Sequence, residues 1–470
     1  MDIDHTLETS LRGLANYLFM IRDGRHQALL FKWGFRRDLR KSPEKLAQDS
    51  WRRLSAMLRY AYERSPHYRS QWDGLGFHPS GLRFGDSLAG LPLITKEVLE
   101  AHKDRMVSGD HRKEDLVLSH TGGSSGNPTS FFMDRTCQAV RVGRQLGILE
   151  LCGQSAGDRV GLVWGAHQDL EGTEEQASPS LGRRLRKFAS GKETFCCNRM
   201  DAEALSAYYR RLRSFRPTAL YGYPRAMVEL ADFIEGRGLK PIRVESVICT
   251  AERLSDAHRQ RLHETFGGEV FNLYCTREHG CIGFECRRHR GFHVDTGSVF
   301  LETVPAAGAA AAADPAAAAA GEIVVTDLRN RGMPMIRNRI GDRGRLCAAR
   351  CPCGSPMPLL SELEGRVSDM IYRPDGAVVP GLLLVDTAMD VPEIRSLRVV
   401  QETLNDVDLH LVPAPGFNEE VQRAVVGGLR RLLGDEIRIR VELVPEIPRS
   451  TGSGKLQEVV SKVKPPATRE

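Results

Sequence analysis

The apolar residues of the first 70 positions follow a helical period. Ser42 and Pro43 are typical of a helix start, with the serine as cap and the proline in the first turn. Apolar side chains then recur at helical spacing until about Ser65 and Pro66, at Leu46, Leu54, Met57, Leu58 and Ala61. The pattern predicts that residues 1 to about 70 are mainly helical.

From about residue 93 to residue 340, apolar runs of strand length alternate with helical runs. The order is VGLVWG, AEALSAYYRRLRSF, TALYGYP, RAMVELADFIEGRG and VESVICTAE. Such alternation predicts an α/β core. Residues 305–321, PAAGAAAAADPAAAAAG, interrupt the pattern, and their prolines and glycines bound or break an alanine helix. We expect an expanded hairpin loop without a chemical role there.

The pattern of apolar and polar residues changes after Gly365. SLRVVQET and VDLHLV have the pattern of a hairpin around Asn405 and Asp406, with Val407, Leu409 and Leu411 on one face of the second strand. A helix capped by Asn418 follows and Gly434 ends it, and IRIRVELV then alternates as a strand. The sequence therefore predicts an α/β protein with a large multi-sheet N-terminal domain (1–365) and a small α+β C-terminal domain (366–470).

Charge and hydropathy narrow the function classes. The 66 basic and 60 acidic residues are interleaved and leave a net charge of +6, which argues against a nucleic-acid-binding protein. No window approaches the ~20 apolar residues of a membrane span. The N-terminus, MDIDHTLETSLRGL, lacks the apolar core of a signal peptide. We therefore expect a cytoplasmic protein whose eleven cysteines are free thiols or metal ligands.

One loop, TGGSSGNPT (121–129), combines glycines with hydroxyl side chains between two extended segments, LVLSH and SFFMD. Bare backbone N–H groups and hydroxyl donors suit phosphate, although a flexible surface linker has the same composition. The loop does not open a helix with Gly-Lys-Ser/Thr, so it is not a standard nucleotide triphosphatase loop.

This loop is the first of six segments that resemble, in the expected order, the signatures of the adenylate-forming superfamily, which includes acyl-CoA synthetases and adenylation domains. The other five are CTAE (249–252), NLYCTREHG (272–280), IRNRIGD (336–342), LEGRVSD (363–369) and PRSTGSGK (448–455). The segment that resembles the family's interdomain hinge, LEGRVSD, coincides with the domain boundary that the change in residue pattern predicts. Cys275 and Arg277 depart from the usual Gly and Thr. The Pro-Thr ending of the glycine loop is similar to phenylacetate–CoA ligases and proteins of CapK type.

The resemblance implies ATP, Mg²⁺ and CoA as cofactors and assigns roles to residues. Glu278 would help to hold Mg²⁺, and Lys455 would bridge the substrate carboxylate and the α-phosphate of ATP. Asp342 would bind the ribose hydroxyls, and Arg366 lies in the hinge. The remaining nucleotide-binding residues that it implies are Thr121, Gly122, Gly123, Ser124, Ser125, Gly126, Thr250, Ala251, Glu252, Asn272 and Tyr274.

These roles predict an enzyme that activates a carboxylic acid, aryl or arylacetic, to an acyl-adenylate and transfers the acyl group to CoA. Fixed cations and a metal offset the repulsion between a carboxylate and the α-phosphate. Two alternatives stay open: another acceptor, such as an amine, a carrier protein or a polysaccharide precursor, and a non-catalytic zinc-stabilised nucleotide-binding protein. A homodimer is a further expectation. The candidates for the acid pocket are Trp164, Gly165, Tyr221, Gly222 and Tyr223, at strand ends before helices. An aromatic core contact would explain Trp164 and Tyr221 nearly as well.

A second constellation pairs Cys286 and His293, seven positions apart, with Cys351 and Cys353 in CPCG. Three thiolates and an imidazole form the ligand set of a closed, structural zinc site. Phenylacetate–CoA ligase-like proteins carry a similar pattern. Scattered thiols beside a turn would look the same, and the substitutes for a misassigned ligand are Cys281, His289 and Cys347.

Overall fold

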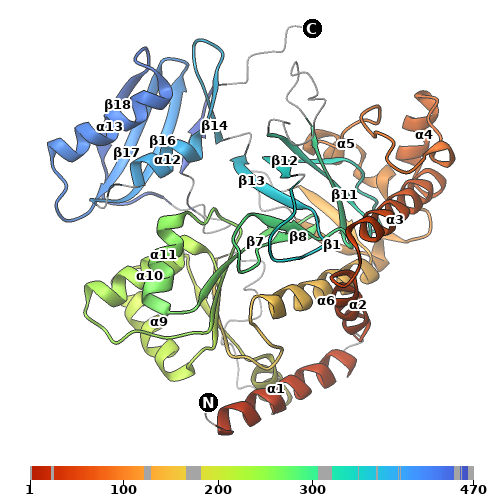
Figure 1. Ribbon diagram of the computed structural model, residues 1–470, viewed down its shortest axis with the longest axis horizontal. Helices are drawn as coiled ribbons and strands as arrows, with labels where there is room; N and C mark the ends of the chain where they lie inside the picture. Colours follow the sequence, from red (N-terminus) through yellow and green to blue (C-terminus); the bar gives the residue numbers. More distant parts are fainter. Residues whose placement is uncertain are drawn as a thin grey trace. The chain divides into compact units, whose positions relative to one another are not determined.

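The computed structural model describes residues 3–22, 26–120, 129–165, 181–304, 320–347, 349–366, 369–389, 391, 393–448, 456 and 458–463. The chain forms two compact units (Figure 1). The larger unit contains residues 1–302, 324–340 and 346–361, and the smaller contains 303–323, 341–345 and 362–470. The mixed α/β class with separate N- and C-terminal parts is confirmed, while the domain boundary after residue 365 stays a prediction.

Four helices fill the N-terminal region, as the sequence predicts: α1 (Ile3–Arg22), α2 (Gln27–Asp38), α3 (Pro43–Arg64) and α4 (Pro66–Gly74). The Ser42 side chain caps α3 by accepting a hydrogen bond from the backbone N–H of Lys45, and Pro43 occupies the first turn. The apolar positions that predict this helix are all buried, because they form the stripe that faces the core.

Helices α2 and α6 (Arg135–Leu151) pack against each other through glycines. A Cβ atom at Gly143 would overlap the carbonyl oxygen of Ala28, and one at Gly147 would lie 2.6 Å from the ring of Phe35. No larger residue fits at either glycine without moving α2. This glycine seam fixes α2 on the helix that also carries two buried arginines described below.

The main sheet of the described residues has eleven strands, in the order β10-β11-β12-β13-β9-β8-β7-β6-β5-β3-β4. Strands β3 to β7 pair in parallel, and the pairs β7–β8, β8–β9 and β9–β13 are antiparallel. The bounds are β3 Val160–Trp164, β4 Lys192–Cys196, β5 Ala219–Gly222, β6 Ser246–Thr250, β7 Glu269–Thr276, β8 Gly280–Phe284, β9 Phe292–Val294, β10 Val299–Val304, β11 Gly321–Asp327, β12 Asn338–Cys347 and β13 Leu359–Arg366.

The helices that alternate with the parallel strands are α8 (Leu181–Ser190), α9 (Ala202–Phe215), α10 (Pro224–Gly236) and α11 (Asp256–Phe266). Side chains of α9, α10 and α11 form one buried cluster with those of β3, β5, β6 and β7, and these three helices flank the strands in Figure 1. The predicted alternation is confirmed, and helix α9 has the predicted bounds. Residues 305–319 of the alanine-rich segment lie outside the described residues, between the neighbouring strands β10 and β11.

The extended segments on either side of the glycine loop are strands β1 (Val117–His120) and β2 (Ser130–Met133), which pair antiparallel. The larger unit also contains α5 (Lys96–Met106) and two 3₁₀ turns, η1 (Pro79–Gly81) and η2 (Lys113–Asp115). None of the helices in the described part of the chain has the length and apolar character needed to cross a lipid bilayer.

The smaller unit contains a four-stranded sheet in the order β18-β17-β16-β19. The predicted hairpin and the helix capped by Asn418 are confirmed, and Val407, Leu409 and Leu411 are fully buried. The sequence interpretation missed α12 and the strand β19, which pairs in parallel with β16. The bounds are β14 Met370–Tyr372, β15 Val378–Pro380, α12 Gly381–Met389, β16 Ile394–Thr403, β17 Asp406–Pro413, α13 Glu419–Leu433, β18 Arg438–Leu443 and β19 Val459–Ser461.

Candidate active site and metal centre

A tight turn between β7 and β8 carries the candidate magnesium ligand, Glu278. The two strands are antiparallel, with Thr276 opposite Gly280, so only three residues form the tip. Gly280 has a φ of +72°, a conformation that favours glycine. The turn holds Glu278 half-buried at the end of the hairpin.

Arg141 of α6 fixes the backbone of this turn. Its guanidinium donates to the carbonyl oxygen of Arg277 at 2.9 Å, to that of Glu278, and to a carboxylate oxygen of Asp327 at 3.0 Å. The side chain of Arg141 is only 14% exposed, so these bonds form away from water and the ion pair is weakly screened. The planar, five-donor guanidinium suits three acceptors at once.

His279, beside Glu278, also supports the turn. Its side chain is buried, and its Nε2 lies 2.9 Å from the side-chain nitrogen of Asn338 at the start of β12. Burial lowers the pKa of His279 to about 4, so the ring is neutral near pH 7 and Nε2 accepts the amide hydrogen. This contact joins the segments 272–280 and 336–342, which the sequence assigns to the same nucleotide site.

The segment CTAE continues from the carboxyl end of β6. The Thr250 hydroxyl donates to the carbonyl oxygen of Leu273 on β7 at 3.1 Å, and Ala251 adopts a φ of +69°, which is uncommon for a residue with a Cβ atom. Asn272 and Tyr274 are buried within the sheet, at 9% and 7% exposure. The structure therefore brings CTAE and NLYCTREHG together on adjacent parallel strands.

Three aromatic rings meet at the carboxyl ends of β3 and β5, where open α/β sheets bind ligands. The ring centroid of Trp164 lies 4.6 Å from that of Tyr223 and 6.0 Å from that of Tyr221. Tyr223 belongs to the buried core, whereas the hydroxyl of Tyr221 accepts a hydrogen bond from Gln145 at 3.3 Å. Core packing therefore accounts for Tyr223.

In the smaller unit, Asp342 lies next to the hinge arginine. One carboxylate oxygen of Asp342 lies 3.7 Å from Nε of Arg366. Asp342 is 9% exposed. The residue that the sequence assigns to the ribose and the arginine that it assigns to the hinge therefore form an ion pair. The residues of the glycine loop, Thr121 to Gly126, and the candidate catalytic Lys455 lie outside the described residues.

The four predicted metal ligands converge in the larger unit. One ligand atom from each of Cys286, His293, Cys351 and Cys353 lies within 4.8 Å of all the others. The sulfur atoms of Cys286 and Cys351 are 3.7 Å apart, and that of Cys353 is 3.3 Å from Nε2 of His293. Tetrahedral thiolates at the zinc–sulfur distance of about 2.3 Å lie about 3.8 Å apart, so the donor set fits such an ion.

Local backbone geometry supports this cluster. The backbone N–H groups of Arg288 and Ser355 donate to the sulfurs of Cys286 and Cys353, each at 3.4 Å. Hydrogen bonds to sulfur favour the thiolate form that a metal requires. Among the predicted substitutes, His289 instead hydrogen-bonds to Glu285 and Glu269.

The sequence interpretation missed two buried side chains that hold the site, Arg141 and Asn338. A signal for the first was present, because Arg141 and Arg144 are one helical turn apart on α6, among the apolar residues of its buried side. Arg144 is 3% exposed and forms ion pairs with Asp38 and Asp295. Buried arginines at helical spacing indicate fixed partners rather than a solvated face.

Comparison with known proteins finds similarity to CoA ligases and to CapK. No family model matches the chain. It is 25% identical to a phenylacetate-coenzyme A ligase of Thermus thermophilus over 89% of this chain and 96% of the relative. It is 21% identical to protein CapK of Staphylococcus aureus over 80% of each chain. Among solved structures, a 2-hydroxyisobutyryl-CoA ligase with a bound acyl-AMP has a TM-score of 0.72, with 20% identity and 91% coverage of both chains.

Proposed function

We propose that this chain, a member of the adenylate-forming superfamily related to phenylacetate–CoA ligases and CapK, is an AMP-forming acid–CoA ligase. It activates a carboxylic acid with ATP to an acyl-adenylate and pyrophosphate. It then passes the acyl group to the thiol of CoA. The acid is aryl or arylacetic, which the aromatic side chains at the ends of β3 and β5 support.

The observation that carries this proposal is the buried support of the turn that bears Glu278. Arg141 binds its backbone, and Asn338 contacts the neighbouring His279. A surface turn needs no such support, whereas a carboxylate that must meet a metal and a triphosphate needs a fixed position.

Each proposed catalytic residue answers one electrostatic need. A Mg²⁺ ion, when bound, neutralises charge on the phosphates, and Glu278 supplies a carboxylate oxygen to hold it. Asp342 accepts hydrogen bonds from the two ribose hydroxyls, because one carboxylate has acceptor sites for both. Lys455 bridges the substrate carboxylate and the α-phosphate, two anions that otherwise repel each other.

A panel of carboxylic acids assayed for pyrophosphate release, with and without CoA, tests the function. We expect acid-dependent release, and a thioester only when CoA is present. Lys455→Ala should abolish adenylate formation while synthetic acyl-adenylate is still converted to thioester. The proposal would be wrong about the acceptor if no acid in the panel gave a thioester and an amine accelerated pyrophosphate release. The acyl acceptor would then be an amine and not CoA.

We further propose that Cys286, His293, Cys351 and Cys353 hold one structural zinc ion. Four protein ligands complete a tetrahedral shell and leave no position for substrate, so the ion would stabilise the fold and take no part in the reaction. The donor spacing supports this proposal. Elemental analysis of protein purified without a metal-affinity tag should give about one zinc per chain.

Finally, we propose a homodimer paired through α1. Four aliphatic residues recur on α1 at alternating spacings of three and four, and each is 52–58% exposed: Leu11, Leu14, Leu18 and Ile21. The opposite face contacts the body of the larger unit, for example through the hydrogen bond from Asn16 to the carbonyl oxygen of Ala156. The 3–4 spacing matches the seam that pairs helices in coiled coils.

Substitutions on the exposed apolar face of α1 test this pairing. Leu14→Glu/Leu18→Glu should convert a dimer to a monomer in analytical ultracentrifugation without changing acid activation. A monomeric wild-type protein at tens of micromolar would contradict the proposal.

A further inference from the structure

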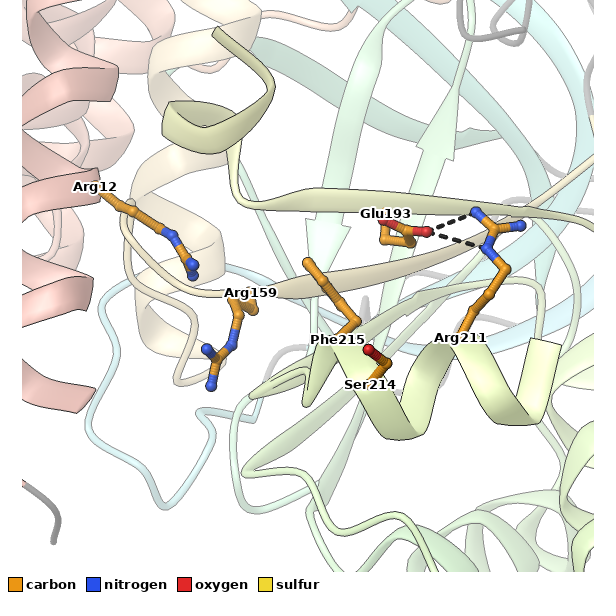
Figure 2. A pocket seen from close by; sticks show the side chains of 6 residues that line it. All are labelled: Arg12, Arg159, Glu193, Arg211, Ser214 and Phe215. Carbon is orange, nitrogen blue, oxygen red and sulfur yellow. Dashed lines mark hydrogen bonds and ion pairs between the residues drawn. The ribbon is translucent and has the colours of Figure 1, made fainter. Parts of the chain in front are cut away.

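An arginine-lined cavity of about 400 Å³ lies in the larger unit, outside all the segments assigned to the nucleotide. Figure 2 shows its lining: Arg12, Arg159, Glu193, Arg211, Ser214 and Phe215. Arg159 immediately precedes β3, and Ser214 and Phe215 end α9. The cavity therefore lies at the amino ends of parallel strands, whereas Trp164 and the candidate active site lie at their carboxyl ends.

Two of these arginines share one carboxylate. The guanidinium of Arg12 forms an ion pair with Glu8, and that of Arg159 lies 3.3 Å from the other carboxylate oxygen of Glu8. The side chains of Arg12 and Arg159 are only 10% and 15% exposed, whereas that of Glu8 is 38% exposed. Two largely buried positive charges thus face one negative charge that is partly in water.

The donors of Arg12 are also incompletely used. Its Nε is buried and has no hydrogen-bond partner among the described residues. Leaving a buried charged donor unpaired costs free energy. In Figure 2 the side chains of Arg12 and Arg159, which share Glu8, lie on the left of the view, away from the Arg211–Glu193 pair.

The remaining lining does not balance this charge. Arg211 donates to a Glu193 carboxylate oxygen from Nε at 3.0 Å and from Nη2 at 2.7 Å. Glu193 is therefore committed to Arg211. Burial lowers the pKa of Arg159, and the nearby charges of Arg12 and Arg216 lower it further, against the opposite effect of Glu8. Several arginines therefore lie close together at the amino ends of these parallel strands.

We propose that this cavity binds a phosphate group at Arg12 and Arg159, where the phosphate takes the place of the partly exposed Glu8 carboxylate that bridges the two guanidinium groups, with the hydroxyl of Ser214 as a further donor. A guanidinium presents paired N–H donors that match two phosphate oxygens. A dianion would offset more of the excess positive charge than a single carboxylate does. The volume accommodates phosphate, pyrophosphate or the phosphorylated end of a larger molecule.

The site is separate from the proposed ATP and acid sites, so its occupancy can be measured without turnover. Thermal unfolding and calorimetry of the full-length protein should use inorganic phosphate, pyrophosphate and adenosine 3′,5′-bisphosphate, with potassium chloride at equal ionic strength as the baseline. We expect saturable stabilisation by at least one of these anions. Tighter binding of the bisphosphate would indicate an organic phosphate as ligand, and tighter binding of the inorganic anions a free one.

Three variants locate the anion. Arg159→Gln should weaken its binding at least tenfold, and Arg213→Gln, an exposed arginine on the same helix as Ser214, should leave it unchanged. Ser214→Glu places a carboxylate in the cavity without removing an arginine. It should raise the melting temperature without added anion and abolish the stabilisation by phosphate. Equal anion binding by wild-type protein, Arg159→Gln and Ser214→Glu, or no binding by any of them, would overturn the proposal.

Discussion

The β7–β8 turn and the Cys/His cluster lie at the two ends of one short strand, yet they are built differently. Strand β8 is five residues long; Glu278 precedes it and Cys286 follows it. The cluster uses side chains whose chemistry identifies them, so sequence alone could name all four. The turn depends on Arg141 and Asn338, which are common residue types that gain a role only from their position in the fold. The ligands of a candidate metal centre can thus be identified from the sequence, whereas the residues that support a candidate catalytic turn can be identified only from the structure.

The largest expected effect comes from replacing two of the candidate metal ligands, which changes the Cys/His cluster and leaves the residues of the β7–β8 turn in place. Cys351→Ser/Cys353→Ser should reduce zinc from about one per chain to nearly none. It should lower the free energy of unfolding by more than about 5 kcal/mol, because binding of a structural metal is coupled to folding. Elemental analysis and chemical denaturation check both outcomes. Cys347→Ser, outside the cluster, is the matched control. Metal-free wild-type protein with full stability would show the thiols to be bystanders.

The next effect acts on the turn and should spare the metal. Arg141→Met leaves the buried carboxylate of Asp327 without its ion-pair partner, which should lower the free energy of unfolding by about 3–5 kcal/mol. The displaced turn should also slow adenylate formation by about 100-fold. Zinc content should stay at the wild-type value. Arg135→Met, exposed on the same helix, is the control. An unchanged dependence of the rate on Mg²⁺ concentration would mean that Arg141 does not position Glu278.

The pH dependence of stability provides a smaller, more local test of the turn. The folded protein resists protonation of His279 because burial lowers its pKa to about 4, whereas the unfolded chain takes up the proton near 6.5. The contribution of His279 to the free energy of unfolding is therefore fully present above pH 6.5. It falls by roughly 3 kcal/mol as the pH is lowered towards 4.

Comparison of His279→Gln with the wild type isolates that contribution. The variant should show a shallower loss of unfolding free energy between pH 6.5 and 4. His67 and His258 also have a pKa of about 4 because of burial, and both remain in the variant, so only the difference in slope is informative. Equal slopes would place the His279 ring in contact with water.

The smallest effect concerns the alanine-rich segment that separates the two halves of the cluster in sequence. Replacing residues 305–319 by a short Gly-Ser linker should change the unfolding free energy by less than about 1 kcal/mol, because loop-closure entropy depends weakly on length. Zinc content and acyl-adenylate formation should be unaffected. A loss of either activity or metal would assign this segment a role that its composition does not predict.

Much of the fold followed from local patterns. The Ser42–Pro43 start of α3 and the bounds of α9 were predictable because capping and period 3.6 are properties of neighbouring residues. Strand β19 was missed because it has only three residues, and its pairing with β16 joins positions about 60 apart. Leu443 fits the apolar face of a strand by pattern but is 52% exposed, because β18 lies at the edge of its sheet.

The candidate site divides in the same way. Asp342 and Arg366 were named from their motifs and form an ion pair. The bonds from Arg141 to the turn at Glu278 join residues about 137 apart, and no local pattern encodes that contact. The charge excess around Arg12 was equally hidden, because its partners come from α1, the start of β3 and the end of α9.

The glycine seam between α2 and α6 has a consequence for synthesis of the chain. Helix α2 ends at Asp38, and α6, on which it packs, begins almost a hundred residues later at Arg135. At about 5–20 residues per second, a translating ribosome needs roughly 5–20 s to supply that partner. During this interval the part of α2 that packs on Gly143 and Gly147 lacks that partner. Helix α2 therefore reaches its native packing only after α6 has been synthesised.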